Sequence, residues 1–438
     1  MIPAPSKILE IDLPENTVRD RPIFSDIAIG SNGSPRIVNT ADNLQALSKY
    51  IGVGFRFNMM EFEPETHDLT GTKIYLSYDQ LRSELISAAS RFSLLKSAID
   101  DHLVALSENN KYHPIKHWLD DGDWDGIARV NSAISCLNAK HEELAQVVIK
   151  RWLVGCVASV YEPTFKSKLV PVLQGAQSYR KTAFVERIAS VMPRAFLEGA
   201  ELNPDNKDSV LSCVRSWIVE LGELERTNKN SQGSLKAFIT KSIDTTRPPY
   251  AKNDIKKPRQ THFIATVNGD NFLKDETGSS RFVVLSMAKA ANMDQLNTIL
   301  GWSFDGTGSI KQPNPELLKQ FWLEVKAMYL DGVGWMLTEK ETTLAQSVNE
   351  PYNDKGSWYE YIKDQYVTDD NFPNNSSSNW ITAGELVKDD DKLSSRETGL
   401  VGKALRKLAN EGVIETRTLR ANRTEYRFPE RNYFSTHG

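Results

Sequence analysis

The sequence predicts an α/β protein built on a sheet of buried strands that helices cover. Between about residues 165 and 290, short apolar runs alternate with helical segments, which is the pattern of a sheet covered on both faces. The region before it carries apolar residues at the three- and four-residue steps of amphipathic helices. After it, a polar run at 368–379 separates a small block that ends in two short strands. We therefore expect an α/β core with a helical N-terminal region and a small C-terminal domain.

The composition is that of an ordinary globular protein and limits the possible classes. With 438 residues the chain has room for two or three domains and a sizeable core. The net charge of −4 means that any nucleic-acid surface must be a local patch. The 3 cysteines lack ligand-like spacing, which argues against zinc and favours a reducing compartment. No apolar run is long enough to span a bilayer and no leader is evident, so we expect a cytoplasmic protein with no membrane partner.

Residues 1–110 form a lead-in region that is mixed at first and then helical. We expect a helix at Ala41–Tyr50, a strand pair around 55–62 and a helical pattern from 77 to 106. Residues 111–164 form a helical subdomain. Its main helix, Glu142–Tyr161, has apolar residues at four-residue steps. We assign no catalysis to the lead-in region.

Residues 165–290 form the predicted core, and its first strand leads into a distinctive loop. The stretch KLVPVLQGAQSYRKT (168–182) is an apolar strand, a turn and a Lys-Thr pair that opens a helix. In phosphate-binding loops the backbone amides face the anion, the lysine reaches the outer phosphates and the hydroxyl binds Mg²⁺. We therefore expect a nucleotide to contact the eight loop residues Gly175, Ala176, Gln177, Ser178, Tyr179, Arg180, Lys181 and Thr182.

The loop departs from the standard pattern G-x-x-x-x-G-K-[ST], because Arg180 occupies the place of the second glycine. That place normally needs glycine so that the backbone can wrap a phosphate, and an arginine adopts the conformation at some cost or contacts phosphate itself. Taken alone, the loop fits an ordinary strand-to-helix turn with a surface lysine equally well. Three further segments follow in order, however: SWIVELGELE, THFIATVN and DETGSSRF. Together the four segments predict an AAA+-like P-loop ATPase core that uses ATP and Mg²⁺.

The strands of this core are expected at 169–173, 217–221, 262–267 and 282–285. A helical region at 291–367 and a linker at 368–379 follow. Residues 380–438 fit a winged-helix domain with a helix at 380–387, a second helix from the Ser394–Glu397 capping box to about residue 410, and strands at 413–419 and 424–428.

Basic residues outnumber acidic ones in the second half of this C-terminal domain. A basic surplus on a helix and hairpin favours contact with DNA phosphates. The alternative is a packing module that is merely solvated by its arginines. The candidate DNA contacts are Arg406, Lys407, Arg420 and Arg423.

The chain resembles the virulence-associated protein E family over about residues 113–287. The strings that carry the resemblance are HPIKHWLDDGDWDGIARV, WLVGCVASVYEP, WIVELGELE, DTTRPPYAKNDIKKPRQTHFIATVN and FLKDETGSSRF. Members of this family are helicase-like ATPases of phages and mobile elements, related to superfamily three DNA helicases.

The resemblance implies roles for the residues at the strand ends. Lys181 would hold the β- and γ-phosphates and Thr182 would bind Mg²⁺. Of Glu220 and Glu223, one would lie near the metal and the other would polarise the attacking water; for Glu223 a helix-capping role stays open. Asn268 would act as the sensor of the γ-phosphate, and a turn-forming role is its alternative.

Two further features follow from the same resemblance. Arg281 falls where the family places an arginine finger that reaches a neighbouring subunit, although Ser280 replaces the first arginine often seen there. The alternative for Arg281 is a salt-bridged surface residue. The basic segment 241–260 corresponds to a hairpin that lines the central channel of related ring helicases, and its alternative is a solvated charged loop. Its candidate DNA contacts are Arg247, Lys252, Asn253, Lys256 and Lys257, with Lys252 and Asn253 near the tip.

These expectations combine into one function and one alternative. The first is an ATP-dependent, ring-forming DNA helicase or translocase for replication of a phage or mobile element in the bacterial cytoplasm. It would form a homo-hexamer with single-stranded DNA in its pore, and the winged helix would contact duplex DNA or replication proteins. The alternative is a DNA-binding replication initiator or scaffold with a degenerate nucleotide site and little or no ATPase activity. A small-molecule kinase is disfavoured because nothing resembles an acceptor-substrate site.

Overall fold

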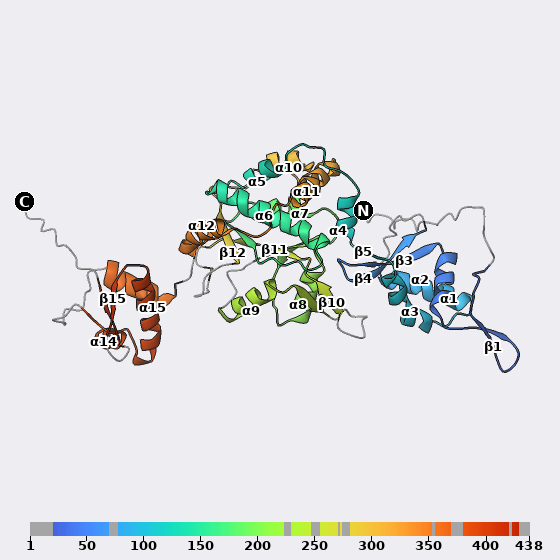
Figure 1. The fold of residues 1–438 in the computed structure, drawn as a ribbon, viewed down its shortest axis with the longest axis horizontal. Coiled ribbons are helices and arrows are strands. Elements are labelled where there is room, and N and C mark those ends of the chain that lie inside the picture. The colour runs from blue at the N-terminus through green and yellow to red at the C-terminus, as the bar shows by residue number, and fades with distance from the viewer. Residues whose placement is uncertain are drawn as a thin grey trace, which may run out of the picture.

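A computed structural model describes residues 21–69, 78–222, 229–246, 255–269, 272–273, 281–352, 355–368, 380–419 and 423–428. The elements fall into three groups along the chain. Figure 1 shows them as the blue, the green-to-orange and the red portions of the ribbon. The strands and helices together confirm the α/β class, and the central group contains the five-stranded sheet.

The N-terminal group packs three helices against a small sheet. Buried leucines of the first two helices, Leu44, Leu47, Leu81 and Leu85, form its own core. The helix expected at Ala41–Tyr50 is confirmed, and the helical pattern of 77–106 is divided into two helices. The elements are β1 (Ile27–Ile29), β2 (Pro35–Ile37), α1 (Ala41–Tyr50), β3 (Val53–Asn58), β4 (Glu63–Asp68), α2 (Tyr78–Arg91), α3 (Ser97–Glu108) and β5 (Lys111–Tyr112).

The central sheet consists of five parallel strands in the order β12-β6-β11-β8-β7. Four of them lie within one residue of the ranges expected from the sequence. The fifth, β7, was not expected, because its residues are half-buried or exposed and a bulge interrupts its register with β8. The strands are β6 (Val170–Gln174), β7 (Phe196–Ala200), β8 (Ile218–Leu221), β11 (His262–Val267) and β12 (Phe282–Ser286).

Helices cover both faces of this sheet, as Figure 1 shows. Alternate strand residues face the two sides: Ile264 belongs to the core under α6, α7 and α11, whereas Phe263 belongs to the core under α8 and α9. The helices are α4 (Pro114–Asp120), α5 (Val130–Ser135), α6 (Glu142–Tyr161), α7 (Lys181–Ala189), α8 (Lys207–Val214), α9 (Lys229–Ile239), α10 (Met293–Leu300), α11 (Pro315–Leu330) and α12 (Glu339–Asn349), which a short 3₁₀ turn, η2 (Glu350–Tyr352), extends.

The main helix α6 has the bounds that the sequence predicts. Its length and hydropathy are sufficient for a membrane span, but 72% of its apolar stretch is buried inside the protein. Trp152 shows why: its indole Nε1 donates to the backbone oxygen of Phe263 at 2.9 Å. The helix is therefore the central support of the sheet.

Two hairpins extend from the central group. The larger one has the antiparallel stem β9 (Ile243–Thr246) and β10 (Ile255–Pro258), and the smaller one joins β13 (Ser303–Phe304) to β14 (Ile310–Lys311). The turn between β3 and β4 of the N-terminal group reaches the larger stem. Its Met60 is 2% exposed and packs in the central core with Ile115 and Leu119.

The C-terminal group has its own hydrophobic core, with Leu386, Val401 and Leu405 fully buried. The capping box expected at Ser394 and Glu397 is present. Its elements are α13 (Ser357–Ile362), a π-helical continuation (Lys363–Thr368), α14 (Ala383–Asp389), a 3₁₀ turn (Ser395–Glu397), α15 (Thr398–Asn410), β15 (Glu415–Thr418) and β16 (Thr424–Arg427). Strands β15 and β16 form an antiparallel hairpin.

Candidate active site

The loop between β6 and α7 contains two left-handed residues, and neither is a glycine. Ser178 has φ of 69°, and Arg180 has φ of 61° and ψ of 31°, both in the left-handed region. Arg180 directly precedes the first helical residue, Lys181. The sequence predicted that Arg180 would need this conformation at some cost, and the structure confirms it. The first amides of α7 therefore border the space that the loop encloses.

Gly175 is required at the start of the loop because Tyr179 lies directly on it. A Cβ atom at this position would come within 2.8 Å of the Tyr179 ring carbon Cδ2 and within 3.3 Å of the Met287 Cβ. The backbone oxygen of Tyr179 accepts a hydrogen bond from the Ala291 amide at 3.0 Å. Tyr179 thus packs inward and fixes the fold of the loop, while the Arg180 side chain is exposed.

Lys181 is 7% exposed, and its ammonium group lies among oxygen atoms at the end of the sheet. Its Nζ donates to the backbone oxygens of Gly175 at 2.7 Å and Ala176 at 3.0 Å. It also donates to the Asn268 Oδ1 at 2.8 Å. The two residues that were expected to face the outer phosphates are therefore in direct contact.

Glu220 joins the other side of the loop to two neighbouring strands. Its Oε1 accepts hydrogen bonds from the hydroxyls of Thr182 at 2.6 Å and Thr266 at 2.7 Å. Its Oε2 accepts from the Gly199 amide at 3.1 Å. The side chain is 1% exposed, so these donors replace the water that a carboxylate otherwise binds.

The parallel register explains why these residues meet. Glu220 lies opposite Ile264 in the pairing of β8 with β11, and Val267 lies opposite Gln174 in the pairing of β11 with β6. Because all strands run in the same direction, the residues that follow their carboxyl ends gather at one edge of the sheet. The expected set Lys181, Thr182, Glu220 and Asn268 is assembled there.

The sequence reasoning missed two partners of Glu220, namely Thr266 and the amide of Gly199. A hydroxyl residue near the end of the apolar strand HFIATV was a usable signal for Thr266. The contact from Gly199 depends on the bulge in β7, which no local sequence pattern indicates. Glu223, the second expected carboxylate, lies outside the described residues.

The hydroxyl and carboxylate pair of Thr182 and Glu220 has the donor chemistry that Mg²⁺ takes in phosphate sites, since both groups offer hard oxygen atoms. Lys181 beside them supplies a positive charge, and its Nζ is hydrogen-bonded to the oxygens of Gly175, Ala176 and Asn268. The edge therefore offers a cation and backbone amides for phosphate, and oxygens for a metal.

Comparison with known proteins gives the relationship of the chain. The virulence-associated protein E-like domain matches residues 119–354, which is more than half of the sequence. The chain belongs to that family. No curated protein matches it. Two solved apo structures of the NrS-1 C-terminal region are similar over 88% of this chain at 11% identity: an A form, covered to 99% with a TM-score of 0.46, and a second, covered to 98% with a TM-score of 0.43.

In this virulence-associated protein E-like chain, Arg281 lies at the opposite end of the sheet from the loop. Its neighbour Phe282 pairs with Val170 at the start of β6, whereas the loop follows the end of that strand at Gln174. At about 3.3 Å per residue, the length of β6 places roughly 15 Å between the two ends. Arg281 is therefore far from the β6–α7 loop of its own chain.

The predicted DNA-binding hairpin is present as a paired stem, and one of its expected contacts is wrong. Lys256 on β10 is exposed, in agreement with the expectation. Lys257 is 2% exposed, and its Nζ donates to the backbone oxygens of Val214 and, at 2.7 Å, of Met60. The charge pattern could not reveal that a turn almost 200 residues earlier covers this lysine. Arg247, Lys252 and Asn253 lie outside the described residues.

The C-terminal basic residues differ in how available they are. Arg423 is paired with Glu385 at 2.9 Å and Glu425 at 3.4 Å, which lowers its value as a phosphate contact. Lys407 donates to the backbone oxygen of Lys355 at 3.3 Å. Arg406 is exposed on α15, and Arg420 lies outside the described residues.

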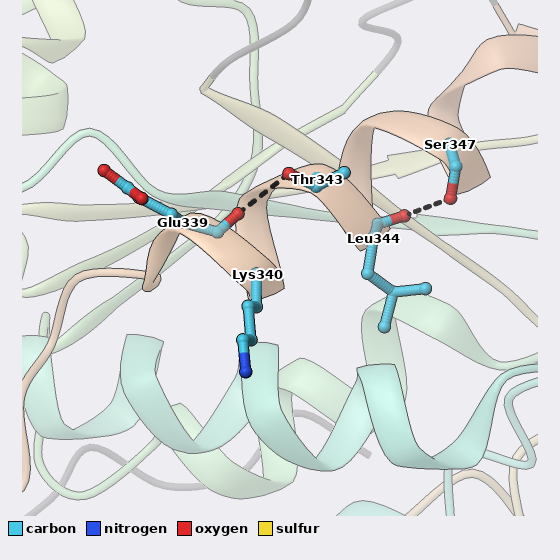
Figure 2. A pocket seen from close by; sticks show the side chains of 5 residues that line it. All are labelled: Glu339, Lys340, Thr343, Leu344 and Ser347. Carbon is cyan, nitrogen blue, oxygen red and sulfur yellow. Dashed lines mark hydrogen bonds between the residues drawn. The ribbon is translucent and has the colours of Figure 1, made fainter.

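A shallow hollow elsewhere on the molecule does not coincide with this site. It lies on the surface of α12, and Figure 2 shows its five lining residues Glu339, Lys340, Thr343, Leu344 and Ser347. The dashed lines mark bonds within the helix, from the Thr343 hydroxyl to the Glu339 oxygen and from the Ser347 hydroxyl to the Leu344 oxygen. These groups form no acid–base or metal-binding set, so the candidate active site remains the edge of the sheet.

Proposed function

We propose that this protein is an ATP-dependent DNA helicase or translocase that serves replication of a phage or mobile element. One observation carries the proposal. At the carboxyl edge of a parallel sheet, the adjacent residues Lys181 and Thr182 are hydrogen-bonded to Asn268 and Glu220, respectively, which lie far from them in the sequence. Membership of the virulence-associated protein E-like family supports the same function.

The roles follow from the chemistry of each group. Lys181 would bind the outer phosphate oxygens in place of the loop carbonyls, as a charge-assisted hydrogen-bond donor. Asn268, already beside it, would orient the attacking water or the γ-phosphate. Thr182 and Glu220 would hold Mg²⁺, which when bound neutralises charge on the phosphates.

The position of Arg281 supports assembly of several copies. It cannot reach the loop of its own chain, so as an arginine finger it would serve the nucleotide on a neighbouring copy. A contact of that kind joins two different surfaces and closes into a ring, for which we propose six subunits. The β9–β10 hairpin, with exposed Lys256, would then face DNA in the channel.

Two features favour the alternative, a DNA-binding scaffold that does not hydrolyse ATP. Ser178 and Arg180 hold left-handed conformations without glycine, and Lys181 is tied to the loop's own carbonyls. Both features oppose the approach of a phosphate. The proposal therefore requires that phosphate binding outweighs them.

The deciding experiment measures phosphate release with and without single-stranded DNA, for the wild type and for Lys181→Ala. We expect DNA-stimulated release from the wild type and a loss of at least about 100-fold in the variant, because the lysine stabilises charge on the transferred group. Thr343→Ala, on the exposed surface of α12, is the control and should keep wild-type release. Equal release from the wild type and Lys181→Ala would refute the ATPase and leave the scaffold.

A further inference from the structure

The outer edge of the central sheet is closed by a side chain instead of a strand. Strand β12 is at the edge, and its inner side pairs with β6. On its outer side, the Asn349 Oδ1 accepts a hydrogen bond from the Val284 amide at 2.8 Å, and the Asn349 Nδ2 donates to the Phe282 oxygen at 2.6 Å. Asn349 is 2% exposed. One carboxamide thus provides the donor and the acceptor that another strand would provide.

The segment formed by α12 and η2 also holds Phe272 and Leu273, which precede Arg281 in the sequence. The Leu273 amide donates to the backbone oxygen of Tyr352 at 3.2 Å, and the rings of Phe272 and Tyr352 lie 5.9 Å apart. Asn349 ends α12, and Tyr352 ends η2, the 3₁₀ turn that follows it. The described residues on both sides of 274–280 are therefore fixed to this one segment.

The other end of α12 is fixed as well. Thr338 and Glu341 form a capping box at its first turn, and the Glu341 carboxylate binds the Arg151 guanidinium of α6 with two hydrogen bonds, at 2.8 and 2.9 Å. Asn349 therefore projects from a helix that is held at both ends.

The contacts described for Arg281 are made by its backbone. Its Nε is buried without a hydrogen-bond partner among the residues that the structure describes, and its backbone oxygen accepts from the Val170 amide at 2.8 Å. The next residue, Phe282, is the one that Asn349 holds. The backbone at Arg281 and Phe282 is thus held by β6 on one side and by Asn349 on the other.

We infer that Asn349 is the positioning residue for Arg281. Through Asn349, α12 fixes the position of the arginine that completes the nucleotide site of a neighbouring copy. The inference rests on the proposed function, because Arg281 has this task only in an ATPase assembled from several copies. It assigns a role to the 291–367 region, for which the sequence suggested none.

The first test compares Asn349→Leu with Gln346→Leu, which makes the same amide-to-leucine change on the exposed face of α12. Asn349→Leu should lower kcat for DNA-stimulated ATP hydrolysis by roughly 10- to 100-fold, the usual effect of a misplaced catalytic group. Its affinity for a non-hydrolysable ATP analogue should stay within about twofold of the wild type, because the nucleotide loop lies at the other end of the sheet. Gln346→Leu should match the wild type in both measurements.

Asn349→Asp guards against a folding defect, since it keeps the size and the acceptor for the Val284 amide but loses the donor to Phe282. It should retain analogue binding and show an intermediate kcat. If both Asn349 variants bind the analogue and hydrolyse ATP at the wild-type rate, the inference is overturned.

The second test mixes two inactive chains. Lys181→Ala chains lack a working nucleotide loop but keep Arg281 and Asn349, and Asn349→Leu chains have the opposite defect. Mixed assemblies should contain complete sites, so turnover per Asn349→Leu chain should rise several-fold over that of the variant alone. Turnover that does not rise on mixing would place the defect of Asn349→Leu in its own nucleotide site and contradict the inference.

The outcomes separate the two claims. A wild-type protein without turnover refutes the proposed function, and this inference falls with it. Wild-type turnover together with an unaffected Asn349→Leu refutes only the positioning role.

Discussion

Arg180 illustrates how a residue can occupy a conformation that its chemistry disfavours. Its φ of 61° lies in the left-handed region, which costs a residue with a Cβ atom about 1 kcal/mol or more. The backbone bonds around it, including the Phe184 amide to the Arg180 oxygen at 3.0 Å, maintain this geometry. These bonds hold Arg180 in the left-handed conformation.

Substitutions at Arg180 should measure this strain. Arg180→Gly relieves it but adds freedom to the unfolded chain, so the free energy of unfolding should change by less than about 1 kcal/mol. Arg180→Val places a β-branched residue at the same φ and should destabilise by about 1–2 kcal/mol. Urea unfolding of both variants tests this. Equal stabilities of Arg180→Gly and Arg180→Val would show that the left-handed conformation is not maintained in solution.

Two buried histidines of the central group, at the start of α4 and of β11, make the fold sensitive to acid. His113 is 6% exposed and caps α4, and His262 is 4% exposed and packs against the Phe165 ring at 5.3 Å. Burial lowers the pKa of each from 6.5 to about 3, with Lys257 adding to the effect at His113 and Arg259 at His262. Both are therefore neutral in the folded protein at neutral pH.

As the pH falls below about 6.5, the unfolded chain takes up these protons before the folded one does. The free energy of unfolding should thus fall, by about 2 kcal/mol per histidine between pH 6.5 and pH 5. Urea unfolding at pH 7 and pH 5 measures the change. His262→Gln should reduce the difference between the two pH values, while His117→Gln, at an exposed position, should leave it unaltered. A wild-type stability that does not fall at pH 5 would contradict the assignment.

Among the elements, α15 carries the exposed basic residues that contact with duplex DNA would require. Arg396 lies just before the helix and Lys403 and Arg406 on it, all three exposed, and none has an ion pair within the portions of the chain that the structure describes. By contrast, Arg417 is paired with Glu425 at 2.7 Å and Arg427 with Glu415 at 2.9 Å in the adjoining hairpin. The basic surplus seen in the sequence therefore lies mainly along the helix.

Arg406→Ala should weaken duplex DNA binding and lower the slope of log Kd against log salt concentration by about 0.9, the value for one lost phosphate contact. Arg427→Ala removes the same charge from a residue that already has a carboxylate partner, so it should affect the slope much less. Fluorescence anisotropy over a salt series distinguishes the two. Identical slopes for the wild type and Arg406→Ala would remove α15 from the DNA surface.

The individual strands differ in how well the sequence predicts them. The buried strands β6, β8, β11 and β12 are apolar and compact, so local pattern located them and the polar residues at their ends. Strand β7 has no such pattern, because FLEGA is half-exposed and bulged. Its amide contact to Glu220 could only be seen once the sheet was assembled.

At the scale of the whole molecule, contacts between segments far apart in the sequence decided what the sequence could not. Lys257 belongs to a basic run that is typical of a DNA-binding hairpin, yet a turn of the N-terminal group covers it. Burial lowers the pKa of Lys257 to about 7, because the charged ammonium group is removed from solvent. Asn349, equally, is an unremarkable helix residue until β12 lies beside it.

The seating of Met60 in the central core has a practical consequence. A fragment that starts at residue 111 would remove Met60 from the central hydrophobic core, expose apolar side chains of that core to water and take one acceptor from the Lys257 ammonium. The shortest fragment that keeps Met60 in the central core must retain β3 and β4. The lead-in region is in this respect part of the hydrophobic core of the central group as well as a neighbour of it.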